Sequence, residues 1–329
     1  MNCINIHVTD YLRASERLSN MKQIDIVNGP QGASQIILGC MRMPALNTDD
    51  AANLIRTAYE LGINFFDHAT CYGRDGEAET RFGDAFSKTG IRREDVYIQS
   101  KCGILSEKGE FNWSKETILE SVNDSLRRLK LDYLDALLLH RPDLLYEPEQ
   151  IAEAFDELEK SGKVRFFGVS NVPTMMLEVL RKYIRQPLVI NQLQFSLDQS
   201  QLIDQTLYVN NLTSERSIDR DNGTLDYCRL HDITVQAWSP LQKGFFQGCF
   251  VDDPELPELN RVLGELGEQY GVSKTAIAIA WILRHPAKIQ TIVGTMNTNH
   301  LRDICEATKV DLTHNEWYRL YLASGKYLP

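Results

Sequence analysis

The chain has 329 residues and a formal net charge of −10, with 43% hydrophobic and 24% charged residues. This length and composition can bury the core of one large α/β barrel or of two smaller domains. The negative charge and the lack of a basic run argue against a nucleic-acid partner, although a local basic cleft for a phosphorylated cofactor is compatible with them.

Cysteine spacing and hydropathy exclude several further classes. None of the seven cysteines forms a C-x-x-C pair, so neither a zinc site nor a disulfide framework is indicated. No run approaches the roughly eighteen apolar residues of a membrane span, and no signal-peptide layout opens the chain. We therefore expect a cytoplasmic protein in a reducing compartment, without a membrane partner.

The first part of the chain divides into an extension and a hairpin. Residues 1–21 mix polar and apolar side chains without a clear period, which indicates an irregular N-terminal extension. The β-prone runs 22–27 and 34–38 flank Asn28-Gly29-Pro30, and such a turn signal between strands predicts a β-hairpin. From residue 22 to residue 329 we expect one domain.

Short apolar runs, each typical of a buried strand, then alternate with segments of helical periodicity. The runs are 36–38, 63–66, 96–98, 136–139, 164–169, 188–190, 233–237 and 291–293. This alternation predicts an α/β fold, a (β/α)8 TIM barrel. An open doubly wound sheet is the alternative, but no G-x-G-x-x-G motif supports it.

Two segments between the strands carry specific signals. In 51–61 the apolar residues fall on one helical face, Thr48 precedes two acids in an expected first turn, and Gly62 follows the expected end. The interval 206–224 is too long and too polar for an ordinary connector, so we expect a mobile loop or lid there.

Reactive side chains follow three neighbouring predicted strands, at the end of a barrel where catalytic residues gather. They are Asp67, Lys101 and His140, and Tyr72 stands in the loop after the first of them. Alone, each has an ordinary explanation: a helix cap, a surface lysine, a core histidine or a loop aromatic. Their coincidence at one barrel mouth favours an active site.

Proton donation by a phenol is the chemistry that suits these four residues. A free tyrosine has a pKa near 10, and a lysine ammonium about 4 Å away would lower it by roughly two to three units. Asp67 would orient Lys101, and His140 would donate to a carbonyl oxygen. A metal site is less favoured, because only one histidine and one carboxylate converge. A Schiff base on Lys101 is a further alternative.

Motifs along the chain match one known family in order. They are Gly62-Ile63-Asn64-Phe65-Phe66-Asp67, Tyr72-Gly73, Ser100-Lys101, His140-Arg141-Pro142-Asp143, Gly168-Val169-Ser170-Asn171, Asn191-Gln192, Trp238-Ser239-Pro240-Leu241 and Val293-Gly294-Thr295. On these motifs, residues 22–325 resemble the aldo/keto reductase family, most of all its bacterial oxidoreductase branch. The resemblance implies a catalytic tetrad of Asp67, Tyr72, Lys101 and His140, and no metal.

The resemblance also implies a nicotinamide nucleotide, with NADPH favoured and NADH the alternative. It assigns the carboxamide to Ser170, Asn171 and Gln192, and the ring to Trp238. The pyrophosphate falls to Ser239, Leu241, Gln242, Lys243 and Gly244, and the adenosine phosphate to Gly294, Thr295 and the next helix. Since no lysine or arginine follows Thr295 directly, His300 and Arg302 are the nearest cations for a 2′-phosphate.

The expected function is NAD(P)H-dependent reduction of a small aldehyde or ketone to an alcohol. The alternative is a regulatory protein that keeps the fold and the bound cofactor, with little turnover. Met41, Trp113 and the 206–224 loop are candidate pocket walls, with ordinary packing or surface as the equal alternative for each. Cys40, Cys71 and Cys102 follow the first three strands, and we expect small buried residues, with a thiol-sensitive site as the alternative. Substrate identity and oligomeric state stay open.

Overall fold

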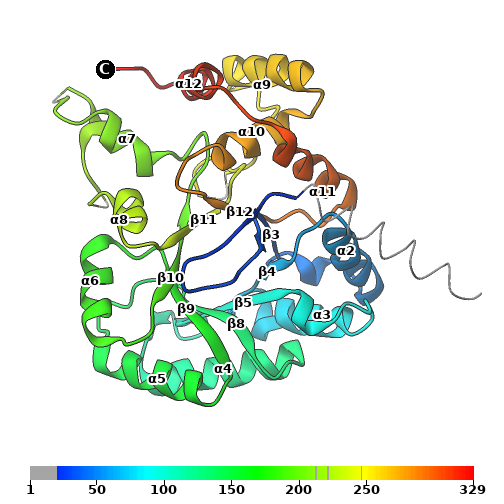
Figure 1. The fold of residues 1–329 in the computed structure, drawn as a ribbon, viewed down its shortest axis with the longest axis vertical. Coiled ribbons are helices and arrows are strands. Elements are labelled where there is room, and N and C mark those ends of the chain that lie inside the picture. Colours follow the sequence, from blue (N-terminus) through cyan, green and yellow to red (C-terminus); the bar gives the residue numbers. More distant parts are fainter. Residues whose placement is uncertain (1–20, 212, 221, 246) are drawn as a thin grey trace, which may run out of the picture.

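The fold is a closed parallel barrel surrounded by helices (Figure 1). The computed structural model describes residues 21–329 except 212, 221 and 246. The extension expected for residues 1–21 lies outside this part of the chain, apart from Met21, which is buried. The barrel strands are β3 (Ile36–Gly39), β4 (Phe65–Asp67), β5 (Tyr97–Cys102), β8 (Leu134–Leu139), β9 (Val164–Ser170), β10 (Leu188–Gln194), β11 (Thr234–Trp238) and β12 (Gln290–Val293).

Strand pairing confirms the predicted TIM barrel and rules out the open sheet. The strands pair in chain order, and β12 pairs in parallel with β3 through Thr291–Ile36, Ile292–Ile37 and Val293–Leu38. Each of the eight predicted runs contributes one strand. The barrel therefore has no free edge.

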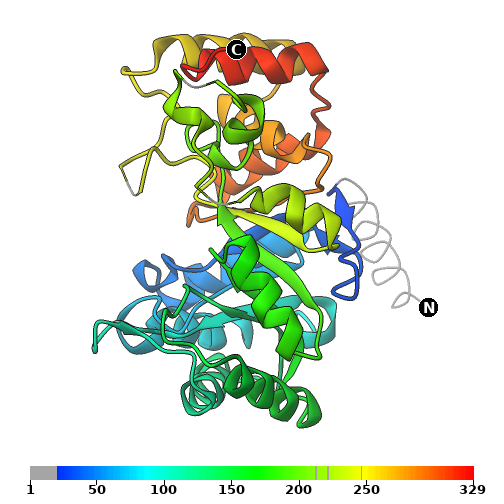
Figure 2. The same cartoon turned by 90° about the vertical axis from the view of Figure 1, so that its left-hand side faces the viewer.

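Helices cover the outside of the barrel. They are α2 (Thr48–Glu60), α3 (Glu77–Phe86), α4 (Lys115–Leu129), α5 (Pro148–Lys160), α6 (Thr174–Tyr183), α7 (Gln201–Leu207), α8 (Thr224–Leu230), α9 (Pro257–Tyr270), α10 (Lys274–Leu283), α11 (Thr298–Cys305) and α12 (His314–Ala323), with 3₁₀ turns at 43–45, 74–76, 93–95, 215–217 and 306–309. Helices α9 and α12 lie side by side at one end of the molecule (Figures 1 and 2). Among the described residues, no helix combines the length and apolar character that crossing a membrane requires.

Asn47 caps the start of α2. Its side chain accepts a hydrogen bond of 2.9 Å from the backbone N–H of Asp50. Asp49 and Asp50 do lie in the first turn, where the helix dipole favours negative charge.

An antiparallel hairpin closes the N-terminal end of the barrel. β1 (Gln23–Ile24) pairs with β2 (Ala33–Ser34), as predicted. Apolar side chains of the hairpin, such as Ile26, join inward-facing strand residues in one core cluster. The predicted run 34–38 is divided, because Ser34 pairs within the hairpin whereas residues 36–39 enter the barrel sheet.

Strand alternation decides which side chains reach the barrel interior. Successive residues of a strand point to opposite faces, so inward positions recur every second residue. In β4, Phe66 packs outward against the helices, whereas Phe65 belongs to the inner cluster and Asp67 follows it at the mouth. In β5, Lys101 stands two residues after Gln99, and both contact Asp67 inside the barrel.

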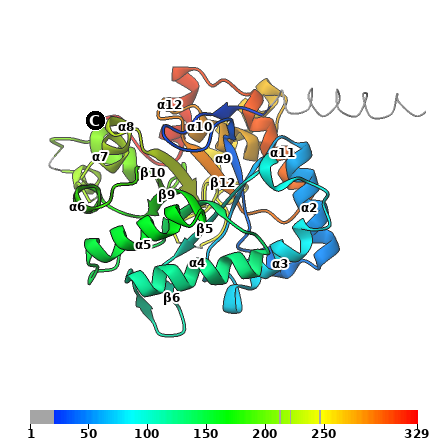
Figure 3. The same cartoon turned by 60° about the horizontal axis from the view of Figure 1, so that its bottom comes forward.

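A second hairpin projects from the barrel after β5 (Figure 3). It consists of β6 (Ile104–Leu105) and β7 (Glu110–Phe111). Trp113, at its base, is fully buried and packs edge-on against Tyr146 with ring centroids 5.8 Å apart. Gly103, at a φ of +94°, leaves room for this indole, since a Cβ there would lie 2.6 Å from Trp113 Cδ1. Trp113 is therefore a packing residue, which was the alternative to a pocket wall.

The 206–224 segment packs against the C-terminal end of the chain. The buried Tyr208 donates a hydrogen bond of 2.6 Å to the carbonyl oxygen of Tyr327, and Asn211 Nδ2 donates to the Tyr327 hydroxyl at 3.2 Å. None of its described residues lines the cavity at the barrel mouth. The described residues of this segment therefore form no wall of the cavity, and the mobile loop or lid stays a prediction.

Candidate active site

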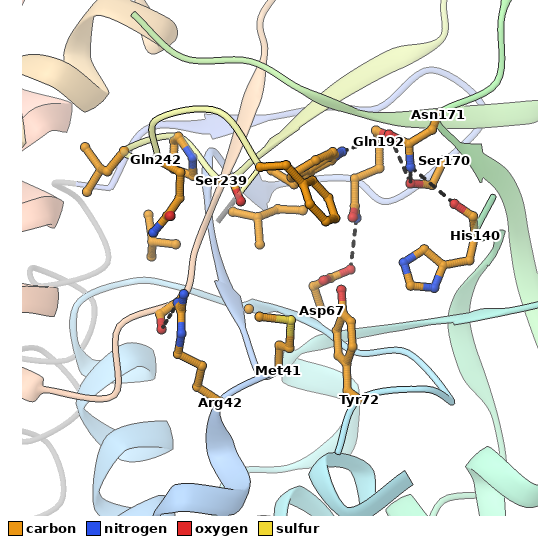
Figure 4. Close-up of a pocket in the computed structure, with 18 of the residues that line it drawn as sticks. Met41, Arg42, Asp67, Tyr72, His140, Ser170, Asn171, Gln192, Ser239 and Gln242 are labelled. Carbon is orange, nitrogen blue, oxygen red and sulfur yellow. Dashed lines mark hydrogen bonds between the residues drawn. The ribbon is translucent and has the colours of Figure 1, made fainter. Parts of the chain in front are cut away.

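A cavity of about 490 Å³ opens at the C-terminal mouth of the barrel (Figure 4). Asp67, Tyr72 and His140 line it, and the fully buried Lys101 lies directly behind Asp67. The structure thus brings together all four residues of the predicted tetrad. They come from the end of β4, the loop after it, the interior of β5 and the residue that follows β8.

Asp67 and Lys101 form a buried ion pair. The Lys101 ammonium donates to Asp67 Oδ1 at 2.6 Å, to Asp67 Oδ2 at 2.7 Å and to the backbone oxygen of His68 at 2.7 Å. All three ammonium protons are therefore used. The pair is almost completely shielded from solvent, with exposed side-chain fractions of 0% and 2%. Asp67 holds Lys101 as expected from the sequence.

Tyr72 lies beside this pair, but its pKa moves opposite to the prediction. Lys101 Nζ is 4.9 Å from the centre of the Tyr72 ring. Burial, and then the negative charge of Asp67, raise the Tyr72 pKa well above its ordinary value, whereas Arg141 lowers it. The expected lowering of the Tyr72 pKa is wrong, because burial of the phenol, the largest cause, and the charge of Asp67 both raise it.

His140 is a neutral imidazole next to the phenol. Burial, followed by the charges of Lys101 and Arg141, lowers the His140 pKa well below its ordinary value. Its ring meets the Tyr72 ring edge to face with centroids 5.9 Å apart. A neutral imidazole has one N–H donor, which suits hydrogen bonding to a carbonyl oxygen.

Of the three cysteines after the first strands, Cys71 alone lines the cavity. Its sulfur lies 3.6 Å from His140 Nδ1, and burial raises the Cys71 pKa. Cys40 and Cys102 are fully buried, as expected of small packing residues. Cys249 also lines the cavity and is exposed, so thiol sensitivity at this site would act through Cys71 or Cys249.

The expected carboxamide-binding residues form a connected polar cluster at one side of the cavity (Figure 4). Asn171 Nδ2 donates to Ser170 Oγ at 2.8 Å and to the His140 backbone oxygen at 3.3 Å. Trp238 Nε1 donates to Asn171 Oδ1 at 3.0 Å, which fixes the indole at the cavity wall. Asn171 holds this place with a φ of +60°, a conformation that asparagine tolerates better than most residues.

The far side of the cavity contains part of the expected phosphate-binding set. Ser239, Leu241, Gln242, Gly294 and Thr295 line it. Lys243 and Gly244 are absent from that lining, contrary to expectation. Lys243 is held by ion pairs with Asp253 and, at 2.8 Å, with Glu255; the Gly244 N–H donates to Asp198.

The predicted 2′-phosphate cations do not reach the cavity. His300 and Arg302 lie exposed on α11, outside the lining. The Asn297 side chain accepts from the backbone N–H groups of Asn299 and His300, so the helix caps its own N-terminus. Arg42 instead lines the cavity, and its Nη1 donates to the Gly294 backbone oxygen at 3.2 Å.

Several site residues were not predicted from the sequence. Arg42 follows β3 by three residues, and the strand-end rule that selected Met41, a confirmed lining residue, would have reached it. Arg141 lines the cavity next to His140, with its guanidinium 5.5 Å from the centre of the Trp238 ring. Gln99 and Gln236 stand two residues before Lys101 and Trp238, and they could have been found because inward-facing positions of a strand recur every second residue.

His68, between Asp67 and the loop, is a buried histidine without a catalytic contact. It is fully buried, packs on Phe82, and neither ring nitrogen has a hydrogen-bond partner in the described part of the chain. Burial, and then Lys101, lower the His68 pKa from 6.5 to about 3. The unfolded chain therefore takes up a proton near pH 6.5, whereas the folded chain does so only near pH 3.

Replacing His68 with leucine is expected to remove one source of acid sensitivity. The contribution of the neutral histidine to the free energy of unfolding is fully present above pH 6.5. It is lost as the pH falls, by about 2 kcal/mol between pH 7 and pH 5. Denaturant unfolding at both pH values measures it in the wild type and in His68→Leu. An equal drop in the free energy of unfolding of both proteins would contradict this assignment. His314→Gln, at an exposed histidine, is the control and should show the wild-type drop.

Comparison with known proteins identifies the family. The model described as "Aldo/keto reductase family" matches residues 35–321. An uncharacterised oxidoreductase of Bacillus subtilis, YcsN, is 36% identical over 306 residues, with 89% of this chain and 95% of that protein covered. A 6-dehydroglucose reductase of Agrobacterium fabrum is 34% identical over 275 residues, with 80% and 84% covered.

A solved structure matches the fold. The crystal structure of a thermostable aldo-keto reductase covers 92% of this chain and 100% of its own, with a TM-score of 0.74 at 24% identity. That likeness agrees with the closed barrel. Given the family match over residues 35–321, this chain belongs to the aldo/keto reductase family and is an oxidoreductase.

Proposed function

We propose that this protein reduces an aldehyde or ketone to an alcohol with a reduced nicotinamide nucleotide, NADPH being the expected one. The observation that supports this most is the convergence of Tyr72, His140 and the Asp67–Lys101 pair on one cavity. The same cavity has an indole wall and an amide cluster at one side and a guanidinium at the other.

The residues around the cavity fit such a cofactor. Trp238 offers an aromatic face for a flat ring, and the polar groups of Ser170, Asn171 and Gln192 stand beside it. Gly294 leaves room for the Arg42 guanidinium beside it, since a Cβ there would lie 2.9 Å from Arg42 Nη1. A guanidinium at this place suits a phosphate, which it can bind through two parallel hydrogen bonds.

The tetrad would then divide the reaction among its members. A bound reduced nicotinamide supplies a hydride to the carbonyl carbon. Tyr72 donates its phenolic proton to the carbonyl oxygen, so that the alcohol forms without a free alkoxide. Neutral His140 donates a hydrogen bond to the same oxygen as negative charge develops there. Asp67 and Lys101 hold a buried pair behind the phenol and fix its surroundings.

Arg42 is expected to contribute more to nucleotide binding than the exposed cations of α11. Loss of a hydrogen bond to a charged group corresponds to roughly tenfold or more in affinity, so Arg42→Ala should raise the Kd for NADPH by that factor. Arg302→Ala should leave it unchanged. Fluorescence titration with NADPH and NADH measures both. If Arg302→Ala instead weakened the binding of NADPH but not of NADH, Arg302 on α11 would be the residue that binds the 2′-phosphate.

A sugar aldehyde is the substrate class that the relatives favour. A 6-dehydroglucose reductase, named for an oxidised hexose, is 34% identical to this chain. The cavity contains the polar groups that a hydroxylated substrate requires, among them Arg141 and Tyr72.

The direct test follows nicotinamide absorbance with a panel of aldehydes and ketones, including sugar aldehydes. Turnover that is lost in Tyr72→Phe supports a reductase. Tight nucleotide binding without turnover of any panel member, unchanged in Tyr72→Phe, would favour the regulatory role instead.

A further inference from the structure

Four buried glutamines form a polar layer inside the barrel, below the cavity floor. They are Gln99, Gln192, Gln236 and Gln290, each with an exposed fraction of at most 2%. Strand register sets their places: Gln192, Gln236 and Gln290 are neighbours across β10, β11 and β12, and Gln99 neighbours Asp67 across β5 and β4. The two groups meet inside the barrel.

Two of these amides bridge Asp67 and Gln236. Gln99 Nε2 donates to Asp67 Oδ1 at 2.7 Å and to Gln236 Oε1 at 2.9 Å. Gln192 Nε2 makes the same two bonds, at 3.0 and 3.1 Å. Both protons of each NH₂ group are therefore used. Figure 4 shows the bond from Gln192 to Asp67 at the cavity floor.

Two groups that can only accept fix the orientation of the amides, the Asp67 carboxylate at one end and the Ser34 backbone carbonyl at the other. Gln236 Nε2 donates to Gln290 Oε1 at 3.0 Å, and Gln290 Nε2 donates to the Ser34 backbone oxygen at 2.8 Å. The Ser34 oxygen can only accept, so Gln290 must turn its NH₂ group toward it and its oxygen toward Gln236. The same reasoning then turns Gln236 Oε1 toward the two amides that bridge to Asp67.

This orientation leaves Gln192 with one unused polar atom. Gln192 lines the cavity, and with its NH₂ group occupied below, Oε1 is the atom that it can offer to a ligand. Gln99 has the same orientation, although this leaves its buried Oε1 without a hydrogen-bond partner among the described residues. The NH₂ groups of Gln99 and Gln192 thus both donate to Asp67 and Gln236.

We propose that Gln236 and Gln290 are positioning residues which, from below the cavity, hold Gln192 as a hydrogen-bond acceptor for the nicotinamide NH₂ group and, with Gln99, hold the Asp67 carboxylate. This inference rests on the proposed function, because it needs a nicotinamide ligand. Neither Gln236 nor Gln290 lines the cavity, so neither can contact that ligand directly.

The test compares NADPH with its 3-acetylpyridine analogue, in which a methyl group replaces the carboxamide NH₂. Wild-type protein should bind NADPH more tightly than the reduced analogue by roughly three- to tenfold, the effect of one neutral hydrogen bond. In Gln290→Met the amide of Gln236 loses the acceptor that orients it, so Gln192 keeps Asp67 as the one fixed acceptor of its NH₂ group and its Oε1 is held less firmly. The ratio of the two Kd values should then fall below roughly twofold. Fluorescence titration gives both constants without turnover.

Two further variants keep the result decisive. Thr291→Val is the matched control, because this buried neighbour of Gln290 has a hydroxyl without a partner in the described part of the chain. It should keep the wild-type ratio. If Gln290→Met does not fold, the double variant Gln236→Met/Gln290→Met removes both partners of their mutual bond, so no NH₂ group of Gln236 is left unpaired, and Gln99 and Gln192 then keep Asp67 as their acceptor.

The outcomes separate this inference from the proposed function. A protein that binds neither nucleotide refutes the proposed function. A protein that binds both, with the wild-type ratio preserved in the glutamine variants, refutes the positioning role alone. Equal weakening of both nucleotides would also refute it, because a general structural defect does not distinguish an NH₂ group from a methyl group.

Discussion

Replacing Lys101 with methionine is expected to lower the free energy of unfolding by about 3–5 kcal/mol. The ammonium is fully buried and gives two of its three hydrogen bonds to Asp67. Its removal leaves a buried carboxylate with only the two amide donors, Gln99 and Gln192. Methionine keeps the length of the side chain, so the loss reports the uncompensated charge and not a cavity.

The double variant Asp67→Asn/Lys101→Met identifies the cause. It replaces the pair by neutral groups of similar size, and its free energy of unfolding should recover most of the loss. Lys88→Met is the surface control, since the Lys88–Asp49 pair is exposed and its removal should leave the unfolding midpoint unchanged. A double variant as unstable as the single one would show that packing, and not charge, explains the defect.

Most of the fold could be predicted because the barrel repeats a simple pattern. A buried strand needs a short apolar run, and a surrounding helix needs apolar residues every three to four positions. Each unit can therefore be predicted from the sequence alone. The hairpin before β3 could be predicted for the same reason, from a turn signal between β-prone runs. The packing of the 206–224 segment could not be predicted, because among its mostly polar residues nothing marks Tyr208 as the buried residue that holds it against the C-terminal end.

The site was predictable where it depends on strand ends, and not where it depends on pairing between distant residues. Asp67 and Lys101 could be selected by position, and the structure pairs them. Burial of the phenol and the charge of Asp67 raise the Tyr72 pKa, an effect that single positions in the sequence could not reveal. Lys243 has the expected place in the chain but is occupied by Asp253 and Glu255, two acids that the motif does not include.

Tyr72→Phe is expected to lower kcat for carbonyl reduction by roughly 10²–10⁴-fold, the usual contribution of a positioned general acid. Phenylalanine keeps the ring that packs edge-on against His140 and removes only the hydroxyl. The Kd for NADPH should therefore change little. Tyr97→Phe is the matched control, because the Tyr97 hydroxyl donates to the Gln31 backbone oxygen, outside the cavity. Steady-state kinetics and nucleotide titration measure both variants.

The pH profile of the wild type supplies the second half of this prediction. Burial and Asp67 raise the Tyr72 pKa, so the phenol keeps its proton through neutral pH and loses it only above the ordinary value of 10. The lowered His140 pKa keeps that imidazole neutral down to pH values below its ordinary 6.5. Carbonyl reduction should therefore be independent of pH from about 6.5 to about 10 and fall above that range. A rate that already declines near pH 8 would mean that the proton comes from a group more acidic than this buried phenol, and the donor would have to be sought among the other cavity residues.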